Sequence, residues 1–160
     1  MDLKSQWRSG RLPGLVGLLA RLILGVVFIV AGGLKVTSPR VSARAVNAFQ
    51  ILPYDVANYV GYVLPVVEIL VGLLLVAGLF TRVSALVGSL LMLAFIIGIS
   101  SAWIRGLSID CGCFGGGGTI AGRQTQYLAD LLRDTGLVAC AAWLVARPRT
   151  SYSLDHRLFG

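Results

Sequence analysis

Residues 59–104 have the sequence YVGYVLPVVEILVGLLLVAGLFTRVSALVGSLLMLAFIIGISSAWI, which is two apolar runs separated only by Thr81 and Arg82. Each run has about the 20 residues that an α-helix needs to cross the hydrocarbon core of a membrane, about 30 Å thick. So short a connection places the two helices antiparallel. This stretch therefore predicts a transmembrane helical hairpin.

Two further apolar segments flank the hairpin, at about residues 14–36 and 127–146. The first is longer than the roughly 7–15-residue apolar core of a signal peptide and contains Arg21, so we expect it to be retained as a helix. With the hairpin segments at 59–80 and 83–104, the prediction is an all-α, polytopic bundle of four transmembrane helices. No β-sheet is expected beyond turns.

The composition supports a membrane protein of one domain. Of the 160 residues, 56% are hydrophobic and 13% are charged, whereas a soluble domain has about 25% charged residues. The net charge of +7 comes mainly from residues at the ends of the apolar segments, as expected for orientation signals and contact with anionic lipids. No clustered basic face with interleaved aromatics is present, so we expect no nucleic-acid partner.

The distribution of Lys and Arg favours cytoplasmic termini in a multi-pass protein of the cell (inner or plasma) membrane. The cytoplasmic side would hold seven basic residues (Lys4, Arg8, Arg11, Arg82, Arg147, Arg149, Arg157) and the outer side five (Lys35, Arg40, Arg44, Arg105, Arg123). Residues 1–13 and 147–160 are then cytoplasmic and flank a transmembrane domain at 14–146. Its loops 37–58 and 105–126 are extracytoplasmic.

The first outer loop contains a predicted amphipathic helix, which the helix-start signal Ser38-Pro39 introduces. Helical spacing places apolar residues on one side (Val41, Ala45, Ala48, Phe49, Leu52) and polar residues on the other (Arg40, Arg44, Asn47). The helix could lie in the membrane interface or pack on the end of the bundle. Both interpretations remain open.

The second outer loop contains Cys111 and Cys113, separated by Gly112. Disulfides persist in the oxidising compartment outside a bacterial membrane. These cysteines can pair only if the chain bends between them, which glycine permits. A strained, exposed disulfide is easily exchanged, and so small a loop gains little stability from it. We therefore predict Cys111, Cys113 and the adjacent Asp110 as catalytic residues, against the alternative of two incidental loop cysteines.

The neighbouring charges would have opposite effects on the ionisation of the two thiols. Arg105, Arg123 and the start of the fourth helix would stabilise a thiolate. Asp110, beside Cys111, would disfavour the thiolate, although it could also relay a proton. The glycines at 115–118 would give a partner protein access to the sulfurs.

We expect no metal site, because zinc needs four ligands and the chain has three cysteines and one histidine. Cys140 and His156 are expected toward the cytoplasmic side, out of reach of the outer loop. Cys140, which lies among alanines, is expected to be a small packing residue.

Two charged residues stand out inside the predicted spans. Arg21 lies about 10 Å from the inner end of the first helix, and Glu68 about 14 Å from the outer end of the second. Intramembrane charges usually face the bundle interior with a partner. We predict that Glu68 points inward and pairs with Arg21, with Lys35 as the other candidate cation. Such a pair could serve a proton or quinone site, or fix the helix register.

These features resemble the MauE family of methylamine-utilisation membrane proteins, in the wider DoxX-like group. The resemblance rests on the element "DCGCFG" in the loop before the last helix and on the opening helix "LARLILGVVFIVAGGLKV", which provides Arg21 and Lys35. "PVVEILVG" provides Pro65, Glu68 and Gly72. The resemblance spans about residues 15–146.

The resemblance implies a membrane component that supports disulfide or electron exchange with an extracytoplasmic thioredoxin-like protein, with a quinone as the candidate cofactor. In methylamine users this serves maturation of a disulfide-rich dehydrogenase subunit. A thiol–disulfide oxidoreductase component is one hypothesis. A noncatalytic scaffold or assembly factor is the other, and the sequence leaves open whether the protein is an enzyme.

Overall fold

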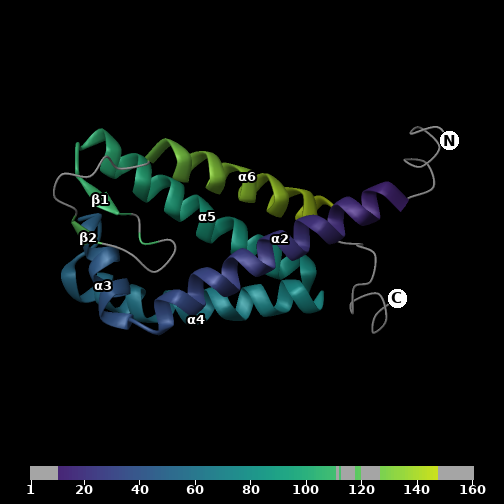
Figure 1. Ribbon diagram of the computed structural model, residues 1–160, viewed down its shortest axis with the longest axis horizontal. Coiled ribbons are helices and arrows are strands. Elements are labelled where there is room, and N and C mark those ends of the chain that lie inside the picture. The colour runs from purple at the N-terminus through teal and green to yellow at the C-terminus, as the bar shows by residue number, and fades with distance from the viewer. Residues whose placement is uncertain (1–10, 111, 113–117, 120–126, 148–160) are drawn as a thin grey trace.

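The computed structural model describes residues 11–110, 112, 118–119 and 127–147. Within them the chain forms five helices and one small β-hairpin (Figure 1). The helices are α2 (Arg11–Val36), α3 (Pro39–Ala48), α4 (Tyr54–Ala77), α5 (Thr81–Ile104) and α6 (Tyr127–Ala146), and the strands are β1 (Ile109–Asp110) and β2 (Gly118–Thr119). The protein is thus an all-α membrane protein apart from this hairpin.

Three of the described helices are long and apolar enough to cross a membrane: Gly14–Val36, Tyr54–Ala77 and Thr81–Ile104. The predicted fourth span corresponds to α6. This helix has 20 residues, but its first half carries Asp130, Arg133 and Asp134. By length and composition alone, the spanning helices are therefore α2, α4 and α5.

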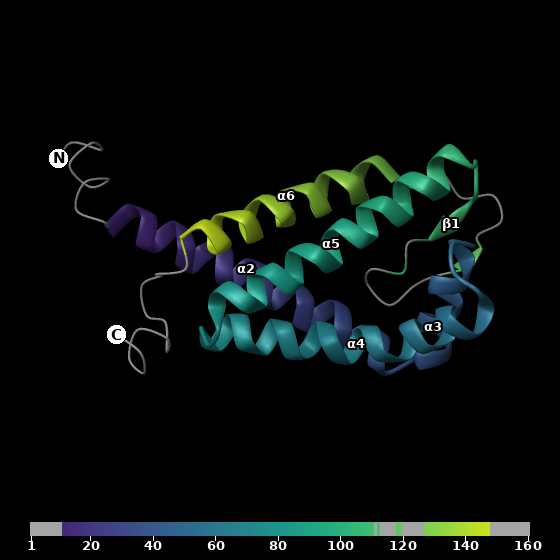
Figure 2. The same cartoon turned by 180° about the vertical axis from the view of Figure 1, so that it is seen from behind.

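The four long helices form a closed bundle. Helix α2 packs most extensively on α4, and α5 on α6, while α2 also contacts α6 and α4 also contacts α5. The start of α2, the α4–α5 turn and the end of α6 lie at one end, and α3, β1 and β2 lie at the other (Figures 1 and 2). This arrangement puts the Thr81 turn and the Asp110 loop at opposite ends of the bundle.

The turn between α4 and α5 differs from the predicted Thr81-Arg82 connection. Helix α4 ends at Ala77, and Gly78 follows with a left-handed φ of 69°, the usual way for a glycine to end a helix. Phe80 also has a positive φ, of 48°, and Thr81 already begins α5. The hairpin itself is as expected.

Glycines allow α2 and α4 to approach closely. A Cβ atom on Gly72 would lie 2.7 Å from the carbonyl oxygen of Gly25, and a Cβ on Gly32 would lie 2.7 Å from that of Pro65. Small residues permit this contact between membrane helices, where dispersion attraction replaces the hydrophobic effect. The contacts fix the antiparallel register: Gly25 is level with Gly72, and Gly32 with Pro65.

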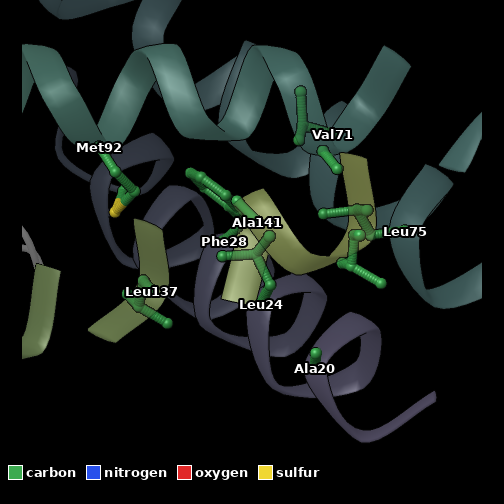
Figure 3. Packing of buried hydrophobic residues seen from close by; sticks show 10 residues of the cluster. Ala20, Leu24, Phe28, Val71, Leu75, Met92, Leu137 and Ala141 are labelled. Atoms are coloured by element: carbon green, nitrogen blue, oxygen red, sulfur yellow. The ribbon is translucent and has the colours of Figure 1, made fainter. Parts of the chain in front are cut away.

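The centre of the bundle is an apolar core from all four long helices (Figure 3). Its largest fully buried side chains include Leu24 and Phe28 of α2, Leu75 of α4 and Leu144 of α6. Large apolar side chains are also exposed along the outer faces of α2, α4 and α5. An apolar inside and outside together are typical of a bundle surrounded by lipid.

Helix α3 forms as predicted after Ser38, with Pro39 in its first turn. Arg40 and Arg44 are exposed, as expected. The buried residues, however, are Ser42, Ala43 and Ala45. Of the apolar face predicted for this segment (Val41, Ala45, Ala48, Phe49, Leu52), only Ala45 is fully buried, and Leu52 is exposed.

The reason is a very close contact between α3 and α4, which only small side chains permit. A Cβ atom on Gly61 would lie 2.4 Å from the Cα atom of Ala43. The Ser42 hydroxyl donates a 2.7 Å hydrogen bond to the Gly61 carbonyl. Packing on the bundle end therefore determines which side of α3 is buried.

The expectation of no β-sheet is wrong for the second outer loop. Strands β1 and β2 pair antiparallel, with Ile109 opposite Thr119 and Asp110 opposite Gly118. Strand β2 packs against α3. Ile109 is fully buried in a second apolar cluster with Ile99, Ala102 and Tyr127. This cluster attaches the loop to the ends of α5 and α6.

Candidate functional site

The predicted redox loop begins at the end of β1. Asp110 is half-buried, and its Oδ1 accepts a 3.2 Å hydrogen bond from the backbone N–H of Gly112. Gly112 has a φ of 66°, in the left-handed region that glycine adopts without strain. Gly112 thus has a backbone conformation compatible with the bend that a Cys111–Cys113 disulfide would need, which stays a prediction. Cys111, Cys113 and Arg123 lie outside the described residues.

Tyr127, the first residue of α6, holds the loop from the other side. Its hydroxyl donates a hydrogen bond to the Leu107 carbonyl and lies 3.4 Å from the backbone N–H of Ile109, which donates to it. Its ring stacks on Trp103 of α5, with centroids 6.1 Å apart. The last described residues before the cysteines are thus fixed to two helices.

Arg105 contacts α3 in the structure. Its guanidinium donates hydrogen bonds to the carbonyls of Phe49 and Gln50 at the end of α3, and of Ser101 in α5. These bonds join the end of α5 to the end of α3, beside the loop. An action of Arg105 on the thiols stays a prediction, because the cysteines are outside the described residues.

A polar groove opens beside α3, at the end of the bundle that carries β1 and β2. It has a volume of about 330 Å³ and is lined by Arg40, Ala43, Arg44, Asn47, Tyr54, Asn58 and Tyr62. The Asn47 amide donates a 3.0 Å hydrogen bond to the Asn58 side-chain oxygen, which joins α3 to α4 within the groove. Two exposed guanidiniums make this surface suitable for acidic groups.

Inside the bundle, Glu68 is fully buried, as predicted, but its partner is Lys35. The Lys35 ammonium donates a 2.6 Å hydrogen bond to Glu68 Oε1, and the two side chains are 4% and 1% exposed. The ammonium also lies 5.0 Å from the centre of the Phe95 ring, a favourable cation–π distance. The predicted pairing of Glu68 with Arg21 is therefore wrong.

The register of α2 and α4 explains this correction. Helix α4 begins at Tyr54, five residues before the predicted start, so Glu68 lies about 21 Å from the start of the helix. Gly32 is its neighbour on α2, with a built Cβ atom 3.1 Å from the Glu68 Cβ. Arg21 lies 11 residues, or about 16 Å, farther along α2. Arg21 is nevertheless buried, at 3% exposure.

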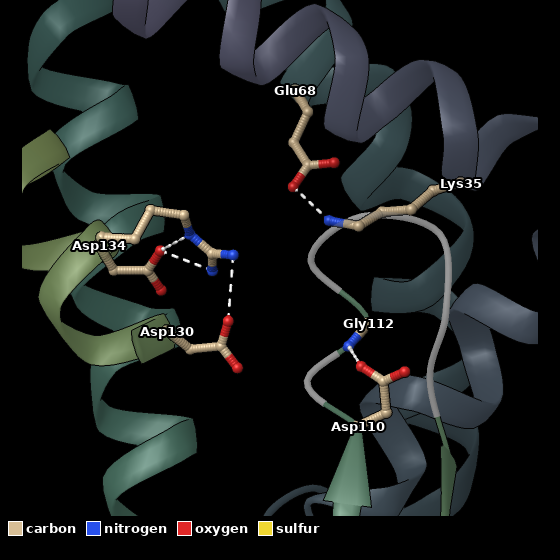
Figure 4. Close-up of polar contacts among 7 residues, drawn as sticks. Lys35, Glu68, Asp110, Gly112, Asp130 and Asp134 are labelled. Atoms are coloured by element: carbon tan, nitrogen blue, oxygen red, sulfur yellow. Dashed lines mark hydrogen bonds and ion pairs between the residues drawn. The ribbon is translucent and has the colours of Figure 1, made fainter. Parts of the chain in front are cut away.

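Helix α6 provides a second buried ionic group that the sequence analysis missed (Figure 4). Arg133 forms ion pairs with Asp134 at 2.9 Å and with Asp130 at 3.1 Å. The Asp134 side chain is 2% exposed, while those of Asp130 and Arg133 are 22% and 28% exposed. The signal was present in the sequence "ADLLRD", because the i, i+3 spacing places Asp130 and Arg133 on one face.

The two ionic groups line one cavity. It has a volume of about 10 Å³, roughly the space that one water molecule needs, and Glu68, Arg133 and Asp134 all border it. Phe28, Met92 and Phe95 are among its apolar neighbours. Glu68 Oε2 and Asp134 Oδ2 are buried and accept no hydrogen bond from the residues that the structure describes.

The candidate cofactor, a quinone, does not fit the polar part of the bundle. The cavity beside Glu68 is far too small for a quinone ring. A larger apolar groove, of about 360 Å³, is lined by Tyr59, Val60, Val63, Leu64, Val67 and Leu91. Among those lining residues only the Tyr59 hydroxyl could bond a ring carbonyl, so we derive no step through a quinone.

Metal binding finds no support in the described part of the chain, where no three Cys, His, Asp or Glu residues are grouped to hold an ion. Cys140 of α6 is a free, half-buried thiol that packs against the apolar core, in agreement with a packing role.

Comparison with known proteins gives one result. The family model described as methylamine utilisation protein MauE matches residues 13–147, which include α3 to α6, all but the first two residues of α2, and the Cys-Gly-Cys positions. No curated protein and no solved structure is similar enough to be matched. Since the match covers most of the chain, this membrane protein belongs to the MauE family.

Proposed function

We propose that this MauE-family protein takes part in thiol–disulfide exchange at the outer face of the membrane. Cys111 and Cys113 would exchange a disulfide with an extracytoplasmic thioredoxin-like protein. The family's description suggests methylamine utilisation as the process. The partner must be a separate protein, because the chain has no Cys-x-x-Cys motif and no thioredoxin domain.

One observation carries this proposal: the turn at Asp110–Gly112 is held at the end of the bundle beside α3. The β1–β2 pairing and the Tyr127 hydrogen bonds fix its start. The left-handed Gly112 bends the chain between the two cysteine positions. The groove with Arg40 and Arg44 lies at the same end and offers a charged surface for a docking protein.

The exchange conserves electrons between two dithiols. A thiolate of the reduced partner attacks one sulfur of the Cys111–Cys113 disulfide, which breaks that bond and leaves the other sulfur as a thiolate. The partner's second thiolate then attacks the mixed disulfide and releases the reduced pair. Two electrons and two protons pass from the partner to this protein, and Asp110 is the proposed proton relay. Repeated turnover needs a second redox partner, such as another dithiol protein, to reoxidise the Cys111–Cys113 pair.

We also propose that α6 is the fourth span. Its exposed positions between Tyr127 and Ala146 carry no charge: they are Leu128, Ala129, Leu132, Thr135, Gly136, Ala139, Ala142 and Ala146. Its charged residues face the other helices instead, in ion pairs. Four spans would place both termini in the cytoplasm and the loop outside, in agreement with the Lys and Arg distribution.

A trapping experiment tests the exchange. In the Cys111→Ser variant, Cys113 should form a persistent mixed disulfide with the partner, visible on a nonreducing gel and lost with reductant. Thiol–disulfide exchange is reversible, and in this variant the Cys113 thiolate would attack the disulfide of the oxidised partner. Cys113 is the sulfur expected to react, because it lies nearer in sequence to the N-terminus of α6 and farther from Asp110. Cys113→Ser should trap far less, and Cys140→Ser none. Mass spectrometry should identify the trapped protein as thioredoxin-like.

The alternative is a noncatalytic scaffold, favoured by the buried Lys35–Glu68 pair and by the lack of a second dithiol in the sequence. It would replace our proposal if neither single variant traps a protein and the Cys111→Ser/Cys113→Ser double variant leaves the redox state of thioredoxin-like proteins unchanged in cells.

A further inference from the structure

Among the residues that the structure describes, the buried and partly buried ionic side chains around the cavity, from α2, α4 and α6, have an unbalanced charge. Lys35 and Arg133 supply two cations, while Glu68, Asp134 and Asp130 supply three carboxylates. If all five are ionised, the group carries one excess negative charge. An uncompensated charge inside a membrane protein is costly, and ionisable residues at such positions usually mark a functional site.

The cavity shows where a compensating ligand would bind. Two carboxylate oxygens beside it, Glu68 Oε2 and Asp134 Oδ2, are buried without a hydrogen-bond donor among the described residues. A buried oxygen of this kind costs free energy until it is bonded. The cavity has room for about one water molecule, so the ligand must be very small.

Charge and size together select the ligand. The excess negative charge disfavours an anion, and the Lys35 ammonium and the Arg133 guanidinium already occupy the cationic positions. A proton removes one charge, supplies the missing donor and needs no additional space. The other elements around the cavity contribute Phe28, Met92 and Phe95, which do not titrate.

We infer that the five residues Lys35, Glu68, Asp130, Arg133 and Asp134 form a buried site that binds one exchangeable proton, with a water molecule in the cavity. The proton converts one carboxylate to a carboxylic acid. It belongs to the coupled group rather than to a single residue. The partly exposed Asp130, one turn or about 6 Å along α6 from Asp134, places the route for exchange toward the start of α6.

This inference does not rest on the proposed thiol chemistry. The Cys111→Ser/Cys113→Ser variant should retain the proton site, so failure of the trapping experiment would leave it untouched. Equally, loss of the proton site would not contradict disulfide exchange.

Infrared difference spectroscopy on the purified full-length protein tests it. As the pH is lowered from about 9 to about 4, one carboxylic acid band from apolar surroundings should appear. Glu68→Gln and Asp134→Asn should each abolish it or confine it to lower pH, because the remaining charges balance. Asp130→Asn, at a more exposed position that is less important for folding, should act in the same direction.

Lys35→Met must have the opposite effect. With one cation removed, the excess negative charge increases, so the band should persist to higher pH. Asp55→Asn, at an exposed position in the first turn of α4, should leave the band unchanged. The proposal is overturned if the native protein shows no such band, or if Asp130→Asn and Lys35→Met, both folded by circular dichroism, leave its pH dependence unchanged.

Discussion

Gly61 of α4 and Ala43 of α3 are in direct backbone contact, since a Cβ atom on Gly61 would lie 2.4 Å from the Ala43 Cα and 2.8 Å from its backbone nitrogen. The contact sets the position of α3 at the end of the bundle. Strand β2 packs against α3 in turn, so the position of the proposed exchange loop depends on the same contact.

Gly61→Ala should therefore destabilise the protein by about 1–3 kcal/mol, because backbone atoms cannot move aside cheaply. Thermal unfolding in detergent, followed by circular dichroism, measures this loss. The matched control is Gly136→Ala in α6, where an added Cβ atom would meet nothing within 4 Å. That substitution should be neutral or stabilise by up to about 1 kcal/mol. Equal effects of the two substitutions would contradict the close contact.

Removing Lys35 alone should be more harmful than removing its whole ion pair. Lys35→Met leaves the buried Glu68 carboxylate without its cation and should destabilise the protein by about 3–5 kcal/mol. The double variant Lys35→Met/Glu68→Met should recover most of this loss, since a buried pair is often replaceable by apolar side chains. Unfolding of both variants in detergent provides the comparison, and Arg82→Met, at an exposed position, is the control. A double variant no more stable than the single one would show that the pair is not an independent unit.

Arg105 should hold the end of α3 in place. Arg105→Met removes the hydrogen bonds to the carbonyls of Phe49 and Gln50, so the amides of α3 should exchange faster with solvent. Because Arg105 is exposed, we expect the free energy of local opening of α3 to fall by only about 1 kcal/mol. This corresponds to a roughly fivefold increase in the exchange rate. Hydrogen–deuterium exchange with mass spectrometry measures it peptide by peptide. Arg44→Met, at an exposed position on the same helix that forms no such bond to the described part of the chain, should leave α3 exchange unchanged.

The position of α6 in the membrane can be tested by single cysteines in the Cys111→Ser/Cys113→Ser/Cys140→Ser background. If α6 crosses the membrane, Ser108→Cys should react with an impermeant maleimide from outside. Phe80→Cys and Arg147→Cys should react only after permeabilisation. If Arg147→Cys were labelled from outside, α6 would not cross the membrane, and the protein would have only the three spans α2, α4 and α5.

The sequence by itself determined the class of fold and most helix positions. Apolar runs of about 20 residues allow only a membrane helix, and the two-residue interruption at Thr81 and Arg82 allows only a hairpin. The helix after Ser38-Pro39 was predictable because a helix start depends on neighbours along the chain. The burial of Glu68 was predictable because a charge exposed to lipid is costly.

Only the tertiary structure decided which charges meet. The partner of Glu68 depends on the sliding position of α2 along α4, which Gly25, Gly32 and Gly72 determine through backbone contacts that no local pattern encodes. A shift of one helix by a few turns would exchange Lys35 for Arg21. The cavity between Glu68 and Asp134 likewise exists only because α6 packs between α2 and α5. The apolar periodicity of a single helix does not determine how it packs against other helices.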